Sequence, residues 1–516
     1  MTEKKDILFI LPPVKPMIRS LDLVYTYFEK ISSQNKMKLL PIPNGIMSIG
    51  SLLEHEGYAI AYYDFIHFES KKNLSDLIKM LIQKHDPKIV GGYAYTPYIN
   101  GLKKAFQIFK QINPEIITIA GGPHVTFLDI QTIKEFNGAL DVVVRGEGEF
   151  TTLELVNKII KGKNYTDILG TTNSKKSNPR RNLLTDEELA NLPAININLI
   201  PKSELKKPLY FSIHCSRGCT YNCTFCANPH FWNRKLRFRS INVIIDEIRK
   251  LNEKYNVFFD FGDTNLPLIK NFKELVKEIC ELTFNNSLGM VLMRANLVND
   301  SRLDLLKKML TDHPKSYITI GVENASDKIL KNMRKPSWNI QYTALKKVKK
   351  YNLDSIPSWM IGFPGESIET MTHNLKCLNY LNKSNLIQTA ICFIFIPTPG
   401  TEPFSNPEKF GIKMTTKNWD FFDRAVFPPP YSLINEKGEL ILSNEQIWAY
   451  FISIITLQKK WRFRKYPQSI REIEPERFLN YLKTNPLYYN VNPTESDITT
   501  YEDYGGKVNN IIFSCV

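Results

Sequence analysis

The sequence predicts an α/β protein with two consecutive parallel-sheet domains, a doubly wound sheet followed by a partial (β/α)6 barrel, and then a mainly helical C-terminal region. Short β-branched or aromatic runs alternate with helical-period segments, and the runs end in Gly, Pro, Thr or acidic residues. The pattern of apolar runs and turn residues in the first 150 residues differs from the pattern after residue 206. We therefore expect a first domain at 1–150, a linker at 151–205, a second domain at 206–405 and a last region at 406–516.

The first domain is predicted from apolar runs that end in small residues, at 4–14, 45–65, 88–96, 115–126 and 139–149. Strands that are buried on both faces of a doubly wound sheet have continuous apolar sequences of this kind. The ligand crevice of such a sheet lies at the carboxyl ends of its strands. Small residues there let a large flat ligand approach the backbone. No G-x-G-x-x-G follows the first run and no G-x-x-x-x-G-K-[ST] occurs, so dinucleotide and nucleoside triphosphate sites lack their phosphate loops.

The second domain is predicted from strand-like runs at 208–214, 257–263, 288–296, 316–324, 355–367 and 388–401, with helical-period segments such as 271–282 and 342–353 between them. Six such units suggest an incomplete barrel with its site at the carboxyl ends of the strands. The polar endings of the runs are therefore candidate site residues. They include Asp263, Glu323 and "GFPGE" at 362–366.

Half of the eight cysteines gather in "CSRGCTYNCTFC" at 215–226. A disulfide framework belongs to short secreted chains, whereas this chain has 516 residues and no signal peptide, which favours a reducing cytoplasm. A zinc site usually pairs two distant knuckles, and no second knuckle follows. Three thiolates on one loop suit an iron-sulfur cube with one open iron. The remaining cysteines are scattered and are expected to be structural: Cys280, Cys377, Cys392 and Cys515.

The spacing Cys219-x-x-x-Cys223-x-x-Cys226, with Phe225 before the last cysteine, resembles the signature of the radical S-adenosylmethionine (SAM) superfamily. "SRGCTYNCTFCANP" followed by "RKLRFRSINVIIDEI" (234–248) resembles its cobalamin-dependent branch in particular. The resemblance implies that these three cysteines hold a [4Fe-4S] cluster and that SAM binds the open iron. Cys215 has no counterpart in the signature, so we interpret it as a bystander, with a reserve ligand as the alternative.

The same resemblance implies contacts to SAM at the barrel strand ends. Asp263 stands where an acidic or glycine-rich motif meets the methionyl amine, and Glu323 where a carboxylate meets the ribose. Gly362 and Pro364 belong to a strand-five motif of the family, and Phe225 would pack near the adenine.

"LPP", "GGPHVT" and "RGEGE" resemble the cobalamin-binding domain that precedes the barrel in that branch. The cobalamin contacts expected at the strand ends are Thr96, Gly121, Gly122, His124 and Gly146. The histidine motif D-x-H-x-x-G is missing, because "DFIH" (64–67) has the wrong spacing and no following glycine. We therefore expect no histidine on the lower face of the cobalt, and a backbone-bonded loop histidine is an equal alternative for His124.

The last region is aromatic and basic. Residues 443–466 predict a helix in which Ser443 and Gln446 form a capping box, and its apolar stretch, 447–457, is too short to span a bilayer. A buried helix, a peripheral element lying on a membrane surface and a lid over an apolar substrate remain open. The net charge of +15 is spread along helical faces, with no RNA-reading module, so we expect solvated surface and no nucleic-acid partner. Phosphorylated or anionic substrates are a secondary interpretation of this charge.

Together these features predict a cobalamin-dependent radical SAM enzyme. The resemblance implies a C-methyltransferase that acts on an unactivated carbon of a natural product, a lipid or a peptide, with electrons from a flavodoxin- or ferredoxin-like donor. Ring closure or rearrangement without methyl transfer is the alternative. A purely structural zinc or iron-sulfur protein would not explain Asp263, Glu323 and "GFPGE". Methylthiotransferases carry additional N-terminal cysteines, whereas the first cysteine here is Cys215.

Overall fold

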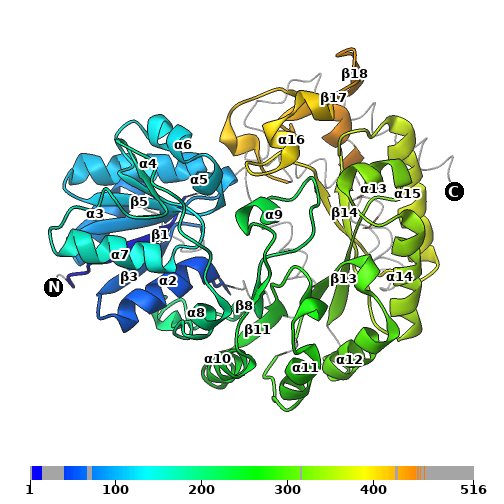
Figure 1. Cartoon of the computed structure of the whole chain (residues 1–516), viewed down its shortest axis with the longest axis horizontal. Coiled ribbons are helices and arrows are strands. Elements are labelled where there is room, and N and C mark those ends of the chain that lie inside the picture. Colours follow the sequence, from blue (N-terminus) through cyan, green and yellow to red (C-terminus); the bar gives the residue numbers. More distant parts are fainter. Residues whose placement is uncertain are drawn as a thin grey trace.

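The computed structural model describes residues 3–13, 40–66, 73–286, 288–313, 316–424 and 428–448, together with 450, 451, 454 and 458. In Figure 1 the N-terminal sheet lies at the left, a barrel of strands and helices at the right, and the C-terminal region above the barrel. The short helix α9 (Asn228–Phe231) lies between the sheet and the barrel wall. The two predicted parallel-sheet domains are confirmed.

The first sheet has the strand order β3-β1-β4-β5-β6-β7. Its parallel strands are β1 (Ile7–Leu11), β3 (Ile60–Asp64), β4 (Ile89–Tyr93), β5 (Ile117–Gly121) and β6 (Val142–Val144). β1 pairs with β3 on one side and with β4 on the other. The strand order therefore reverses at β1, and a crevice forms there at the carboxyl ends of the strands. The strands are almost entirely buried, which is why they read as continuous apolar runs.

The helices of this domain are α2 (Asn44–His55), α3 (Leu74–His85), α4 (Ile99–Ile112), α5 (Pro123–Phe127), α6 (Asp129–Phe136) and α7 (Glu149–Ile160). β7 (Thr171–Asn173) pairs antiparallel with β6 at the edge of the sheet. The segment 151–205 is therefore more than the linker that the sequence predicted. Its first part completes the N-terminal sheet, and its remainder, with α8 (Asp186–Ala190), leads to the barrel.

Six parallel strands build the barrel: β8 (Leu209–Ile213), β11 (Val257–Phe261), β12 (Met290–Met293), β13 (Tyr317–Glu323), β14 (Ser358–Ile361) and β15 (Ile391–Ile394). A parallel bridge between Phe259 and Leu288 joins the first two strands to the other four, so the strands follow one another in chain order. β2 (Leu40–Pro41), which lies in the predicted first domain, pairs with β8 at the open edge.

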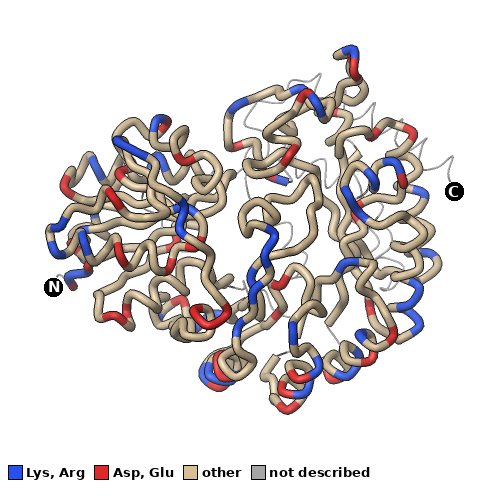
Figure 2. The backbone as a smooth tube through the Cα atoms, viewed as in Figure 1, with Lys and Arg blue, Asp and Glu red and all other residues tan. Residues whose placement is uncertain are grey.

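Helices follow the barrel strands and lie outside them in Figure 1. They are α10 (Ile241–Lys254), α11 (Phe272–Cys280), α12 (Asp300–Leu310), α13 (Asp327–Met333), α14 (Trp338–Lys350) and α15 (Ile368–Lys383). Figure 2 shows Lys and Arg on these helices together with Asp and Glu, which agrees with a net charge that is mostly solvated surface.

The described part of the C-terminal region contains α16 (Glu402–Ser405) and an antiparallel sheet of β16 (Ile412–Met414), β17 (Tyr431–Ile434) and β18 (Leu440–Leu442). The expectation of a mainly helical region did not include this sheet. The predicted capping box is confirmed, because the Ser443 amide donates to Gln446 and the Gln446 amide to the Ser443 hydroxyl. Most of the predicted helix after residue 448, and Cys515, lie outside the described residues. Within the described chain, no helix combines the length and the apolar character that crossing a membrane requires.

Candidate active site

The loop that carries Cys219, Cys223 and Cys226 follows β8 at the mouth of the barrel. Arg294, at the end of β12, donates from Nη1 to the Cys223 sulfur at 2.9 Å, and its guanidinium lies 4.4 Å from the centre of the Tyr221 ring. Asn265 approaches the Cys219 sulfur at 3.9 Å. Burial raises the pKa of the Cys226 thiol to about 11. A bound metal cation would favour the thiolate form.

In the part of the chain that the structure describes, no three His, Cys, Asp or Glu side chains are grouped tightly enough to surround a single metal ion. An iron-sulfur cube places each thiolate on a different iron, which spaces the sulfurs more widely than one zinc ion does.

Cys215 is fully buried in the core and anchors the loop through its backbone amide, and its thiol also bonds to Asp263. The Cys215 amide donates to Asp263 at 2.9 Å, and the Ser216 amide and hydroxyl both donate to the other oxygen of the same carboxylate. Burial raises the pKa of Asp263, and these hydrogen bonds partly offset that effect. Asp263 therefore ties the start of the cysteine loop to the end of β11. Its contact with SAM stays a prediction.

Glu323 ends β13 in the left-handed region, with φ of +71°, next to a β-bulge. Its Oε1 accepts hydrogen bonds from the Ser358 hydroxyl at 3.0 Å and from Lys335 at 3.4 Å, and both charged side chains of this pair are more than nine-tenths buried. The Oε2 atom is buried without a hydrogen-bond partner. A buried carboxylate oxygen is costly to leave unpaired, so this atom is suited to accept a hydroxyl from a ligand.

The "GFPGE" motif forms the turn after β14 and is held by its own glutamate. Glu366 accepts the amide hydrogens of Gly362 and Phe363, at 2.6 and 3.2 Å, and the side-chain amides of Asn324 and Asn374. Burial raises the pKa of Glu366 to about 7. The turn thus fixes Gly362 and Pro364 against the end of β13. Phe225 of the cysteine loop contacts this turn through an edge-to-face contact with Phe363, with ring centres 6.3 Å apart.

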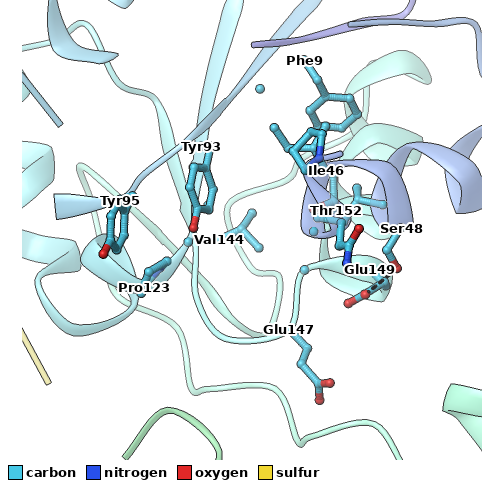
Figure 3. Close-up of a pocket in the computed structure, with 18 of the residues that line it drawn as sticks. Phe9, Ile46, Ser48, Tyr93, Tyr95, Pro123, Val144, Glu147, Glu149 and Thr152 are labelled. Atoms are coloured by element: carbon cyan, nitrogen blue, oxygen red, sulfur yellow. Dashed lines mark hydrogen bonds between the residues drawn. The ribbon is translucent and has the colours of Figure 1, made fainter. Parts of the chain in front are cut away.

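A cavity of about 690 Å³ lies between the N-terminal sheet and the barrel. Figure 3 shows part of its wall, with Tyr93 and Tyr95 on one side and Phe9, Ile46 and Thr152 across from them. The cavity lies at the carboxyl ends of the first sheet, where the crevice was predicted. Three of the expected cobalamin contacts line it: Gly121, Gly122 and Gly146.

The other two expected cobalamin contacts lie behind this wall. Thr96 and His124 are buried, and the His124 Nδ1 lies 3.2 Å from the Thr96 hydroxyl. The His124 ring makes an edge-to-face contact with Trp419 at 4.8 Å, and burial lowers its pKa to about 3. Neither residue is part of the lining of the cavity. His214, from the end of β8, lines the cavity from the barrel side, and burial lowers its pKa to about 4.

An ion-pair network that the sequence did not reveal joins the cavity to the cysteine loop. Arg217 binds Glu147 at 2.9 Å and Glu149 at 2.8 Å, and Arg237 binds Glu147 at 2.6 Å. Both glutamates belong to the "RGEGE" segment and both are almost completely buried. Burial alone would raise the pKa of Glu149, but Arg217 holds it below its usual value. The network is a direct link between the two domains.

Two aromatic residues missed by the sequence reasoning extend this link. Phe231 and Trp232 stand only a few residues after Cys226, at and after the end of α9, and both line the cavity. Arg237 lies 5.1 Å over the Trp232 ring. The backbone that carries the third cysteine therefore continues directly into the cavity wall.

These residues fit the cofactors that the sequence implied. The loop offers three thiols beside N–H donors, the end of β13 offers an unpartnered carboxylate oxygen, and the cavity offers glycines where a flat ligand would lie. At Gly122, with φ of +134°, an added Cβ would lie 2.7 Å from the Ala94 carbonyl oxygen, so this close backbone approach requires glycine. Which side chains contact each cofactor stays a prediction.

Comparisons with known proteins agree with this reading. The Radical SAM superfamily model matches residues 213–378, and the B12 binding domain model matches residues 35–156. A protein from Pyrococcus horikoshii named an uncharacterized methyltransferase is 31% identical over 358 residues, which cover 67% of this chain and 74% of that protein. The anaerobic magnesium-protoporphyrin IX monomethyl ester cyclase of Rubrivivax gelatinosus is 28% identical over 398 residues, which cover 74% of this chain and 69% of the cyclase.

Among solved structures, the radical SAM methyltransferase TsrM from Kitasatospora setae, with cobalamin and a [4Fe-4S] cluster bound, aligns with a TM-score of 0.64 at 13% identity. The alignment covers 98% of this chain and 99% of TsrM, so the two share their overall fold. The chain therefore belongs to the cobalamin-dependent radical SAM enzymes, with a [4Fe-4S] cluster, SAM and cobalamin as its cofactors.

Proposed function

We propose that this enzyme methylates an unactivated carbon of a natural product, a lipid or a peptide. The observation that carries this proposal is the continuity of the two sites, since the loop with Cys226 runs through α9 into Phe231 and Trp232 on the cavity wall. A methyl transfer of this kind needs a radical source and a methyl carrier that reach the same carbon. The name of the Pyrococcus horikoshii relative supports the same reaction class.

The residues of this chain would position the reacting groups. We assign Cys219, Cys223 and Cys226 to the cluster and the free oxygen of Glu323 to the ribose of SAM. When bound, the cluster and SAM supply a 5'-deoxyadenosyl radical and cobalamin supplies the methyl group, so the hard chemistry belongs to the cofactors. The protein orients them and excludes water.

Gly121, Gly122 and Gly146 would let the corrin ring approach the first sheet. Tyr93 and Tyr95 add apolar area beside them, and burial raises the pKa of Tyr95, so its phenol stays neutral. We propose a flavodoxin- or ferredoxin-like electron donor and a cytoplasmic location, because the cluster loop would be damaged in an oxidising compartment.

Ring closure without methyl transfer is the second candidate, and the name of the Rubrivivax gelatinosus relative supports it. The two reactions leave different by-products. The reconstituted enzyme is incubated with SAM that carries a CD3 group, a reductant and fractionated extracts, and the products are followed by mass. Methyl transfer predicts S-adenosylhomocysteine and 5'-deoxyadenosine in about equal amounts and a product that carries the labelled methyl. 5'-Deoxyadenosine without S-adenosylhomocysteine, together with a product two hydrogens lighter, would refute methyl transfer and support ring closure.

A further inference from the structure

Arg424 lies where the C-terminal region crosses from the N-terminal sheet to the last barrel strand. Just before it, η7 (Trp419–Phe421) packs on η2 (Thr96–Tyr98) and on α4. The Ile394 amide, on β15, donates to the Arg424 carbonyl oxygen at 3.0 Å. The backbone of Arg424 is therefore fixed to the barrel while the residues preceding it are fixed to the first domain.

The Arg424 side chain lies on the inner face of β15. Its guanidinium is 4.9 Å from the centre of the Phe393 ring. The neighbouring Cys392 faces the other way, because its sulfur accepts a hydrogen bond from Gln458 of the C-terminal region, and successive side chains of a strand point to opposite faces. Phe393 is paired in register with Met360 of β14. Arg424 thus projects toward the space that the barrel strands enclose.

Packing places Arg424 between the two halves of the active site. On one side, Phe421 and Tyr95 both pack against Tyr98, Tyr95 lines the cavity, and the charge of Arg424 opposes the rise that burial causes in the pKa of the Tyr95 phenol. On the other side, Arg424 is bonded to β15 at Ile394, and the ring of the next residue, Phe395, contacts Phe363, which contacts Phe225 of the cysteine loop. Arg424 therefore lies between the cobalamin cavity wall and the barrel strand that packs toward the cysteine loop.

Arg424 also differs from four other cations near the site, whose charged groups already have partners in the protein. Arg217, Arg334 and Lys335 are each paired with a glutamate, and Arg294 donates to the Cys223 sulfur and to the Arg334 carbonyl oxygen. Arg424 is exposed and has no carboxylate partner among the described residues. A guanidinium placed against an aromatic ring, with its N–H fork free, is suited to bind a carboxylate or a phosphate through two parallel hydrogen bonds.

We propose that Arg424 binds a carboxylate or phosphate group of the substrate and thereby selects anionic substrates. This inference rests on the part of the proposed function that places the substrate within reach of both cofactors, between the cysteine loop and Tyr95. It narrows the expected natural product, lipid or peptide to one that carries an acidic group. The carboxylate of SAM is the other source of the same chemistry, and the test has to separate the two.

The test measures binding to the reconstituted holoenzyme by ligand-observed nuclear magnetic resonance, with decanoate, decyl phosphate and decanol as probes. We expect the wild type to bind the two anions about tenfold more tightly than the alcohol, since charge-assisted hydrogen bonds are roughly twice as strong as neutral ones. Arg424→Gln should remove this preference and Arg424→Lys should keep part of it. Arg249→Gln, on the exposed surface of α10, removes the same charge elsewhere and should keep all of it.

A wild type without charge preference, or an Arg424→Gln variant that keeps it, would overturn the inference. So would an Arg424→Gln variant that binds SAM about tenfold more weakly while its probe preference is unchanged, because Arg424 would then serve the carboxylate of SAM. The probe test measures affinity and the labelled-methyl test measures turnover, so the two proposals can fail separately. Intact charge preference in an enzyme that forms 5'-deoxyadenosine without S-adenosylhomocysteine would refute the methylation proposal and leave this one standing.

Discussion

In the first sheet, the carboxyl ends of β1, β4, β5 and β6 carry glycine, aliphatic or tyrosine side chains, whereas the segments at the carboxyl ends of the barrel strands carry carboxylates and amides that are already bonded. Gly121 and Gly122 line the cavity, and the apolar Val144 lies beside them. Across the interface, Glu366 accepts four hydrogen bonds from the "GFPGE" turn and its neighbours, and Asp263 holds the start of the cysteine loop.

This difference shows two ways of building a cofactor site. A large flat ligand gains its binding free energy from buried apolar area and from shape complementarity. The residues of its wall must therefore leave space for it, and few of them need to offer hydrogen bonds. A loop that has to present three thiols at fixed positions needs bonded supports behind it. The predictions below test each wall separately and then the link between them.

The largest effect is expected in the cysteine loop. Cys219→Ala, Cys223→Ala and Cys226→Ala should each abolish the cluster absorption and the cleavage of SAM after anaerobic reconstitution, which should give about four irons per chain in the wild type. Cys215→Ala is the matched control and should keep its iron, because Cys215 supports the loop through its backbone amide. Iron content that depends on Cys215 but not on one of the other three would show that the ligand assignment is wrong.

The second effect concerns the cavity wall. A Cβ at Gly121 would meet no atom closer than 3.8 Å, and its φ is not positive, so Gly121→Leu should fold and fill the cavity instead. We expect loss of cobalamin binding, measured by absorption after gel filtration, with an unchanged iron content. Gly121→Ala is the smaller control and should bind cobalamin more weakly than the wild type but more tightly than Gly121→Leu. Full cobalamin occupancy in Gly121→Leu would place the corrin elsewhere.

The third effect concerns the link between the walls. Arg217→Met leaves Glu149 buried with only the Ser48 hydroxyl as a side-chain donor, at 2.8 Å. Breaking a buried pair by removing one partner costs about 3–5 kcal/mol, so the free energy of unfolding should fall by that amount in urea. Lys250→Met removes a cation from an exposed pair with Asp246 and should change stability little. Equal midpoints of urea unfolding for Arg217→Met and Lys250→Met would mean that the ion-pair network does not hold the domains together.

The link also marks the limit of what the sequence could predict. The six barrel strands and the strands of the first sheet follow from local alternation of apolar runs and turns, so they were predictable. Arg217 and Glu149 are 68 residues apart in the chain, and nothing in "SRG" or "RGEGE" indicates that they pair. The edge pairing of β2 with β8 was hidden for the same reason, because two residues carry no periodicity.

The roles of acidic residues were harder to predict than their positions. Asp263 and Glu366 both come at strand ends, where ligand contacts were expected, yet their described partners are backbone amides and side chains of the protein. Sequence position cannot separate a carboxylate that binds a ligand from one that holds a turn. The unpartnered oxygen of Glu323 does distinguish it, and that observation needs the structure.

A fourth prediction follows from the turn held by Glu366. Burial raises its pKa to about 7 from an ordinary 4.5, so between these values the folded state binds a proton that the unfolded state has lost. The free energy of unfolding should therefore fall as the pH rises through this range and level off above it. Glu366→Gln should remove this component. The measurement compares urea unfolding of both proteins at pH values from about 5 to about 8. Parallel pH profiles for the two proteins would contradict it.

The last prediction is that replacing His124 leaves the electron paramagnetic resonance spectrum of the bound cobalamin unchanged. Among the described residues of the first domain, no histidine lines the cavity. His124 lies behind the wall, where its Nδ1 faces Thr96 and its ring packs on Trp419. His67 lies outside the described residues. Cob(II)alamin bound to this protein should therefore be base-off without an imidazole ligand, and electron paramagnetic resonance should show no nitrogen splitting from the protein. His124→Leu should leave that spectrum as it is. His214→Leu is the informative companion, because His214 reaches the cavity from the barrel side. A nitrogen splitting that disappears in any one of the variants His67→Leu, His124→Leu or His214→Leu would identify a cobalt ligand and contradict the expectation drawn from the missing D-x-H-x-x-G motif.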